Sequence, residues 1–310
     1  MIQVENLVKS YGDLRAVNDV SFNVKGGEVY GFLGPNGAGK TTTLSMLSGL
    51  LAPDSGRIQV DEIDLAERPL EVKARLGVAP QENAIYDDLS AREHLKFWAG
   101  LYGLSGAKLR EAVARVLDDV GLAGRADEPT KQFSGGMKRR LNLALALVHS
   151  PKVVLLDEPT VGIDPQARNN ILEVVHRIAE QGTTVLYTTH YLEEAERLCD
   201  RIAIIDHGKV LAEGTLEELQ RMVGGEEVVT VCAAFGDDLR ARLGALPGVR
   251  ELSAEEGRLV LATETQAGER GSVALLKTLF DEGVALESVA IEPPTLNGLF
   301  LKLTGRELRD

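Results

Sequence analysis

Long apolar runs are missing from this sequence of 310 residues. Purely apolar stretches such as Val153–Leu156 are short and end in charged residues, whereas a helix needs ~20 apolar residues to cross a bilayer. The N-terminus also lacks a basic region followed by an apolar core, so we expect no signal peptide. The sequence therefore predicts a chain with no membrane-spanning segment.

Cysteine and positive charge are also scarce. The two cysteines, Cys199 and Cys232, do not have the spacing of a metal or redox motif, and we expect both to be small buried residues in a reducing compartment. The 34 Lys and Arg residues face 47 Asp and Glu residues, giving a net charge of −13. Binding to a phosphate backbone calls for a basic excess, so we expect no nucleic-acid partner.

What is present is the composition of an ordinary globular protein, with 44% hydrophobic and 26% charged residues. The apolar pattern predicts strands at 2–4, 17–24, 28–33, 153–156 and 184–187. A helix with Leu44, Leu47, Leu50 and Leu51 on one face is expected after the third strand, and another helix at 168–180. This alternation of strand and helix predicts a parallel α/β sheet.

Two further regions complete the predicted organisation. Residues 86–150 are expected to be mostly helical, with a capping box at Ser90–Glu93 opening one helix. A domain boundary is predicted near Thr215, where a second capping pattern precedes Gly224 and Gly225. We therefore expect a domain at 1–215 and a small α/β domain at 216–310, whose predicted strands are 228–234, 258–263 and 286–291 and whose predicted helices are 238–246, 273–280 and 295–303.

A glycine-rich loop lies between the predicted strand at 28–33 and the helix after it. It fits the phosphate-loop pattern G-x-x-x-x-G-K-[ST] in the context that this pattern requires. Glycines let successive backbone N–H groups point into one concavity, and the following helix adds the positive end of its dipole. We expect Lys40 to reach the β- and γ-phosphates, Thr41 to offer its hydroxyl to Mg²⁺, and Thr42 to hold the α-phosphate side. The expected nucleotide-binding residues of this loop are Gly34, Pro35, Asn36, Gly37, Ala38, Gly39, Lys40, Thr41 and Thr42.

A second feature is the pair of carboxylates that ends the strand at 153–156. Alone, Asp157 and Glu158 would more often be two solvated acids at a strand end. With a phosphate loop upstream, the carboxyl ends of parallel strands become the expected place for chemistry. Asp157 is then predicted to hold Mg²⁺ through water, and Glu158 to polarise the water that attacks the γ-phosphate.

A third feature is Ser134-Gly135-Gly136 at the start of a predicted helix. Ser134 is a candidate N-cap, and the glycines allow close approach to the helix N–H groups, which gives a second candidate anion site. An isolated S-G-G of this kind would more often be only a capped helix. Lys138-Arg139-Arg140 is expected to be a solvated helix face without a ligand role.

Along the chain the order is the glycine-rich loop, then Ser134-Gly135-Gly136, then the acidic pair in Leu156-Asp157-Glu158-Pro159-Thr160. In that order the three motifs resemble the ATP-binding subunit of an ABC transporter, with its P-loop NTPase fold and helical subdomain. The resemblance covers residues 1 to about 215, and smaller marks extend it. It implies that Tyr11 stacks on adenine, Gln81 ligates Mg²⁺, His190 holds the γ-phosphate, and Asp164 lies in a loop that reaches the partner subunit.

The mechanism that this resemblance implies is ATP hydrolysis with Mg²⁺ in a head-to-tail homodimer, with catalytic roles for Glu158, His190 and Gln81. Each ATP would lie between the phosphate loop of one copy and Ser134-Gly135-Gly136 of the other, and Thr41, Gln81 and Asp157 would be the metal ligands. A separate multi-span membrane permease is expected as partner, with the chain peripheral at the cytoplasmic face of the plasma membrane. Residues 81–102 are its expected docking surface, where Ile85, Tyr86 and Leu89 either contact the permease or belong to the helical core.

Departures from the usual signature indicate a subgroup. Phe133 and Met137 stand at the ends of a motif that is usually L-S-G-G-Q, and S-G-G-M-K-R-R resembles exporters of the daunorubicin-resistance type and related lipid and polysaccharide exporters. The tail from Ile291 to Arg306 resembles the same group, except that Asn297-Gly298 replaces its usual acidic pair.

Three alternatives are weighed against an exporter subunit. A soluble ABC ATPase acting on ribosomes or DNA would have coiled-coil insertions or two nucleotide domains, and the charge is unsuitable. A P-loop kinase or switch would not need Ser134-Gly135-Gly136 or His190. A binding subunit with a degenerate ATP site is opposed by Glu158, Gln81 and His190.

Overall fold

The computed structural model describes the whole chain except residues 224–226, 234–236, 256, 265–270, 293–294 and 306–310. It divides into two compact units, Met1–Leu211 and Ala212–Asp310, which are described separately. In the described part of the chain, no helix is long and apolar enough to cross a membrane.

The first unit contains an antiparallel sheet with the strand order β2-β1-β4-β5. Alternate residues of β1, such as Ile2 and Val4, are buried in the core, as expected for a strand with one solvated face. The strands are β1 (Ile2–Tyr11), β2 (Leu14–Val24), β4 (Ser55–Val60) and β5 (Ile63–Asp64).

The second sheet of this unit carries the candidate site and has the order β10-β9-β3-β8-β7-β6. Strands β9, β3, β8, β7 and β6 pair in parallel, which confirms the predicted parallel α/β sheet. The strands are β3 (Val29–Leu33), β6 (Leu76–Ala79), β7 (Val153–Asp157), β8 (Thr184–Thr189), β9 (Arg201–Asp206) and β10 (Lys209–Gly214). Every residue of β3, β7 and β8 is buried, because helices pack on one face of this sheet and the antiparallel sheet together with a helix packs on the other. The helices of this region are α1 (Lys40–Leu47), α2 (Pro69–Lys73), α6 (Pro165–Glu180) and α7 (Leu192–Leu198).

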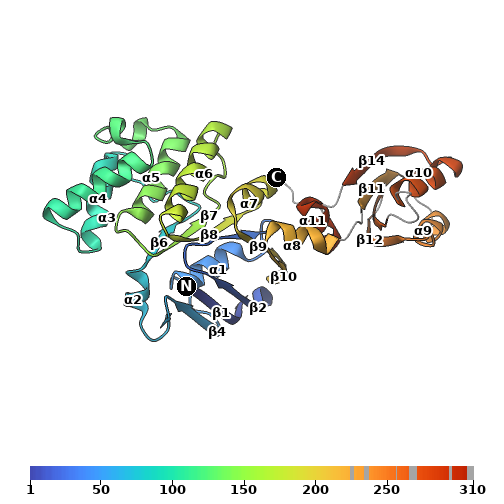
Figure 1. Cartoon of the computed structure of the whole chain (residues 1–310), viewed down its shortest axis with the longest axis horizontal. Coiled ribbons are helices and arrows are strands. Elements are labelled where there is room, and N and C mark those ends of the chain that lie inside the picture. The colour runs from blue at the N-terminus through green and yellow to red at the C-terminus, as the bar shows by residue number, and fades with distance from the viewer. Residues whose placement is uncertain (224–226, 234–236, 256, 265–270, 293–294, 306–310) are drawn as a thin grey trace. The chain divides into compact units, whose positions relative to one another are not determined.

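The segment between β6 and β7 is helical, as predicted, and forms the green group of helices in Figure 1. It contains α3 (Ala91–Leu101), α4 (Gly106–Asp119), η1 (Ala123–Arg125), η2 (Thr130–Gln132) and α5 (Gly135–Leu147). The capping box at Ser90 and Glu93 is confirmed, with both reciprocal hydrogen bonds present. These helices share one apolar core with the sheet, which fixes the start of α5 relative to the strand ends.

Two predictions for this unit are wrong. Leu50 does not extend the apolar face of α1, because α1 ends at Leu47, Gly49 follows with φ +67°, and Leu50 is 78% exposed. Lys138-Arg139-Arg140 is not a solvated face, because Arg139 is only 4% exposed.

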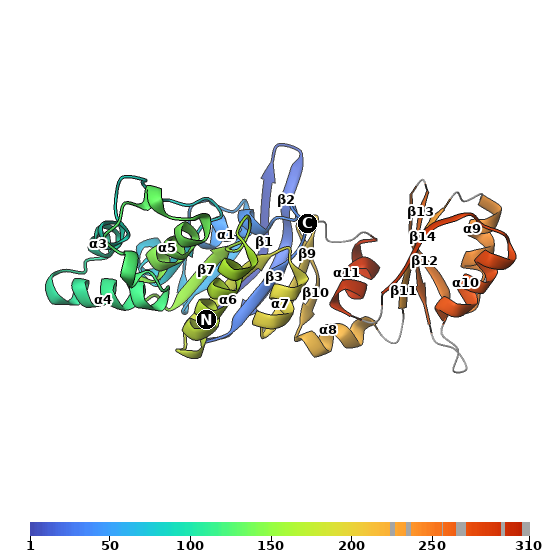
Figure 2. The ribbon, with the colours of Figure 1, turned by 90° about the horizontal axis from the view of Figure 1, so that it is seen from above.

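The second unit holds an antiparallel sheet with the order β12-β13-β11-β14. Its chain order, β-α-β-β-α-β, is that of a ferredoxin-like fold. The elements are α8 (Leu216–Val223), β11 (Glu227–Ala233), α9 (Asp237–Gly244), β12 (Val249–Glu255), β13 (Arg258–Thr263), α10 (Gly271–Asp281), β14 (Leu286–Glu292) and α11 (Leu296–Thr304). Helices α9 and α10 cover one face of the sheet and α11 lies on the other (Figure 2).

The sequence prediction missed β12, an edge strand with charged residues at Arg250, Glu251 and Glu255 and no fully buried position. Gly224, Gly225, Ala234 and Arg306 of the predictions lie outside the described residues. The two cysteines are free, as expected, but both are half-buried rather than buried.

Candidate functional site

The glycine-rich loop joins the carboxyl end of β3 to the start of α1. Gly39 must be glycine, because its φ is +105° and a Cβ there would lie 2.4 Å from the Ala16 carbonyl oxygen. A Cβ at Gly34 would lie 2.2 Å from the Ile205 carbonyl oxygen. The loop therefore has the close-packed, curled backbone that presents N–H groups to phosphate.

Lys40, Glu158 and His190 come together from the ends of three neighbouring strands. Lys40 Nζ lies 2.9 Å from Glu158 Oε1 and donates to the carbonyls of Gly34 and Pro35 at 2.6 and 3.0 Å. Glu158 Oε2 lies 3.2 Å from His190 Nδ1. All three side chains are nine-tenths buried or more. The fold thus concentrates a cation, a carboxylate and an imidazole at one point of the sheet edge, as expected for parallel strands.

Two atoms at this point have unused hydrogen-bonding capacity. Within the described residues, Glu158 Oε2 and His190 Nδ1 are buried and lie 3.2 Å apart, but neither makes a hydrogen bond of normal geometry. Such groups are rare in cores and are expected where a ligand or a reacting water is bound.

The backbone around Glu158 is strained. Glu158 has φ +45°, in the left-handed region that side chains other than glycine seldom adopt. Thr188 stabilises this turn, since its hydroxyl accepts from the Glu158 N–H at 2.9 Å and donates to Asp157 Oδ1 at 2.8 Å. Sequence reasoning missed Thr188. The signal that could have found it is its position near the end of β8, the parallel strand beside β7.

A cavity of about 450 Å³ opens beside these groups. Tyr11 lies in its wall and is 51% exposed, and Gln81 faces the same space. The residues that line it are Tyr11, Leu14, Ala16, Asn36, Gly37, Gly39, Lys40, Thr41, Thr42, Gln81 and Glu158. Asp157, Gly34, Pro35 and Ala38 are not among these lining residues, and Asp157 is only 4% exposed.

The Ser134-Gly135-Gly136 segment does not line this cavity. Ser134 caps α5, accepting from the Met137 N–H at 3.2 Å, and Asp164 caps α6, accepting from the Ala167 N–H at 2.9 Å. The two caps lie close together, because a Cβ on Gly136 would be 2.5 Å from Ala167 Cβ. Gly135, by contrast, has open space around it.

Sequence reasoning also missed the role of Arg139, whose guanidinium donates to the backbone carbonyls of Gln81 and Glu158. No sequence signal marks this role, because the partners of Arg139 are backbone carbonyls of distant segments and burial on α5 is not confined to one face. Burial lowers the pKa of the Arg139 guanidinium, an effect that the nearby Asp157, Tyr187 and Glu158 oppose.

The fold and the phosphate loop define a P-loop nucleoside triphosphatase. The sequence pattern of the "ABC transporter" family matches residues 17–161, and that of "ATP-binding protein DrrA1-3-like, C-terminal domain" matches residues 214–304. The linearmycin resistance ATP-binding protein LnrL of Bacillus subtilis (strain 168) is 43% identical, over 100% of both chains. The Nod factor export ATP-binding protein I of Burkholderia orbicola (strain AU 1054) is 41% identical, over 100% of this chain and 98% of that one.

Solved structures agree with these relatives. A structure described as the ATP binding subunit of an ABC transporter has a TM-score of 0.66 and 33% identity, covering 72% of this chain and 93% of that chain. A dimeric ATP-binding cassette bound to ADP and Pi, in a post-hydrolysis state, has a TM-score of 0.64 and 27% identity, covering 70% and 99%. The chain belongs to the ATP-binding subunits of ABC transporters, and it is an ATPase. The predicted fold class and family are confirmed.

Proposed function

We propose that this chain powers an ABC exporter, for a drug, lipid or polysaccharide-like substrate, as a head-to-tail homodimer. The observation that carries the proposal is the convergence of Lys40, Glu158 and His190 beside the 450 Å³ cavity. Relatives that match over the full length are named for linearmycin resistance, daunorubicin resistance and Nod factor export. The net charge of −13 disfavours the alternative of a soluble ATPase acting on ribosomes or DNA.

In this proposal ATP binds in the cavity, with adenine stacked on Tyr11 and the phosphates over the N–H groups of the glycine-rich loop. Lys40 exchanges part of its contact with Glu158 for the β- and γ-phosphates, and Thr42 contacts the α-phosphate side. Glu158, whose Oε2 makes no hydrogen bond of normal geometry within the described residues, accepts a proton from the attacking water, and His190 contacts the γ-phosphate.

The residues present also fit Mg²⁺, since the Thr41 hydroxyl and the Gln81 amide face the cavity and provide the oxygen donors that this ion prefers. We propose that Thr41, Gln81 and, through water, Asp157 hold it. Bound there, Mg²⁺ neutralises charge on the β- and γ-phosphates.

A second copy completes the site. Ser134, Gly135 and Gly136 do not line the cavity of their own chain, and the open space at Gly135 would admit a phosphate from the partner's nucleotide. Asp164, at the adjacent cap, is placed to contact the same partner.

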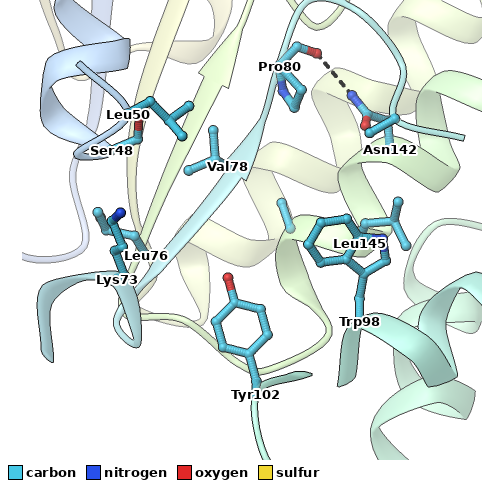
Figure 3. Close-up of a pocket in the computed structure, with 12 residues that line it drawn as sticks. Ser48, Leu50, Lys73, Leu76, Val78, Pro80, Trp98, Tyr102, Asn142 and Leu145 are labelled. Carbon is cyan, nitrogen blue, oxygen red and sulfur yellow. Dashed lines mark hydrogen bonds between the residues drawn. The ribbon is translucent and has the colours of Figure 1, made fainter. Parts of the chain in front are cut away.

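We propose that the permease docks in a second cavity of the first unit, of about 310 Å³. Figure 3 shows Leu50 on one side of it and Trp98 and Tyr102 on the other. Tyr86 and Leu89 are exposed and lie in sequence between Ala84 and Trp98, which line this cavity, so we keep them in the proposed docking surface at 81–102. Ile85 instead packs against the helical core, so we leave it out of this surface.

The remaining assignments follow from this arrangement. The ATPase domain is 1–215, with its helical subdomain at about 86–150, and 216–310 is an accessory domain that aids contacts with the second copy or the permease. Through the permease, the chain is peripheral at the cytoplasmic face of the plasma membrane.

The test is co-purification from solubilised membranes of the host. We expect a stoichiometric multi-span membrane protein to accompany the wild-type chain. Leu50→Asp should abolish its capture while the isolated chain keeps its ATPase activity, because Leu50 is exposed and lines the second cavity but not the nucleotide cavity. Lys209→Asp, an exposed change outside this cavity, is the matched control. Capture of ribosomal or DNA-repair proteins alone would refute the exporter assignment.

A further inference from the structure

Arg139 is a buried cation on α5, the helix that Ser134 caps. Within the described part of the chain no carboxylate forms an ion pair with it. Burying a charge without a counter-ion is costly unless its hydrogen bonds are satisfied, so we ask what groups satisfy the Arg139 guanidinium.

All three guanidinium nitrogens donate to backbone carbonyls. Nε donates to Pro159 O at 2.7 Å, and Nη2 donates to Asp157 O at 3.1 Å and to Glu158 O. Nη1 donates to Pro80 O at 2.9 Å and to Gln81 O at 2.6 Å. One side chain thus links the segment of the proposed base to the segment of Gln81, and links both to α5.

These contacts act on a strained turn. The positive φ of Glu158 belongs to a class of unfavourable backbone conformations that persist only where the surroundings hold them. Thr188 holds the N–H of Glu158, and Arg139 holds its carbonyl oxygen. Together they fix the direction in which the Glu158 carboxylate points.

Asn142, one turn along α5, supports the same link. Its amide donates to Pro80 O at 3.0 Å, the contact drawn as a dashed line in Figure 3. Pro80 O therefore receives two donors from α5, and a movement of that helix is transmitted to the residue before Gln81.

We propose that Arg139 is a positioning residue that couples the Ser134 end of α5 to Gln81 and Glu158 of the same chain. The coupling rests on the proposed head-to-tail dimer, in which Ser134 contacts one nucleotide while Gln81 and Glu158 act on the other. Contact at the start of α5 then adjusts the catalytic groups of the opposite site through one rigid guanidinium. A lysine cannot replace it, because an ammonium is a compact charge without the planar fork that reaches both segments.

The test compares Arg139→Lys and Arg139→Ala with Arg140→Lys. Arg140 is the matched control, since its guanidinium donates only to the carbonyls of Val120 and Gly121 in the described structure, away from the site. We expect both Arg139 variants to bind ATP within about threefold of wild type while kcat falls about 10²-fold, the usual effect of misplacing a catalytic group by about 1 Å. Arg140→Lys should keep wild-type kcat.

Two readouts separate positioning from simple structural support. Guanidinium at a low, non-denaturing concentration should restore part of the kcat of Arg139→Ala and leave Arg139→Lys unchanged. In a double-mutant cycle, Ser134→Ala and Arg139→Lys should be non-additive in kcat.

Several results would overturn the inference. They are a kcat within threefold of wild type, a parallel loss of ATP affinity without rescue by guanidinium, additivity with Ser134→Ala, or failure of both Arg139 variants to fold, which would make the role purely structural. Light scattering of the wild type with ATP distinguishes failure of the dimer: if no dimer forms and kcat still falls in Arg139→Lys, the proposed function fails while the placement of Glu158 by Arg139 stands.

Discussion

Glu158→Gln removes the charge from the carboxylate that contacts both Lys40 and His190. In a proton-accepting role, this group is expected to contribute about 10²–10⁴-fold to turnover, equivalent to about 2.7–5.5 kcal/mol of barrier. The buried ion pair that Glu158 forms with Lys40 also stabilises the fold. Removing one partner of such a pair costs about 3–5 kcal/mol, and since the carbonyls of Gly34 and Pro35 still accept from Lys40, we expect the low end, about 3 kcal/mol.

The effect of Glu158→Gln on thermal stability should change sign when ATP is added. Without nucleotide, Glu158→Gln should unfold at lower temperature than wild type. With ATP it should be stabilised more than wild type, because Lys40 is no longer shared with Glu158, and it should accumulate as an ATP-bound dimer. Phosphate release, thermal denaturation with and without ATP, and light scattering measure the three outcomes.

The matched control is Glu193→Gln, which removes the same charge from an exposed position in the first turn of α7. It should keep wild-type turnover and thermal stability. Turnover of Glu158→Gln within threefold of wild type would refute the assignment of Glu158 as the base, whatever happens to stability.

Three further predictions concern other parts of the first unit. Tyr11→Ala should weaken ATP binding by about 1–3 kcal/mol, the value of a base stacked on an aromatic ring, whereas Tyr11→Trp should bind nearly as wild type in the same titration. Gly136→Ala should destabilise the fold by about 1–3 kcal/mol, because its Cβ would lie 2.5 Å from Ala167 Cβ. Gly135→Ala should unfold like wild type but lose ATPase activity, because the space around Gly135 is open. Loss of stability in both variants would contradict the proposed need for open space at Gly135. Burial lowers the pKa of His149 in the folded chain below its ordinary 6.5. The unfolded chain therefore takes up a proton first, and stability is lost as the pH falls below about 6.5. The melting temperature of His149→Gln should fall less steeply than that of wild type between pH 7.5 and 5, and an unchanged slope would refute this cause.

The errors of the sequence predictions have identifiable physical causes. Leu50 was assigned to α1 by its spacing alone, but a left-handed glycine at position 49 ends the helical path before it. Strand β12 was missed because an edge strand with charged residues lacks the apolar alternation of a half-buried strand. Arg139 was assigned to solvent because a run of three basic residues is usually solvated, and its partners are carbonyls far away in the sequence.

The sequence by itself determined the chemistry that each local segment can perform. A glycine-rich loop between a strand and a helix, two acids after an apolar strand, and a serine-capped helix with two glycines are local patterns, and local patterns suffice to predict the family, the parallel sheet and the expected residues. Only the tertiary structure decided which of these residues meet. It brought Lys40, Glu158 and His190 to one point, kept Ser134 away from their cavity, and placed the guanidinium of Arg139 between Gln81 and Glu158. The Arg139 contacts join segments dozens of residues apart, and their partners are backbone atoms that every residue type carries, so no pattern of side chains along the sequence reveals them.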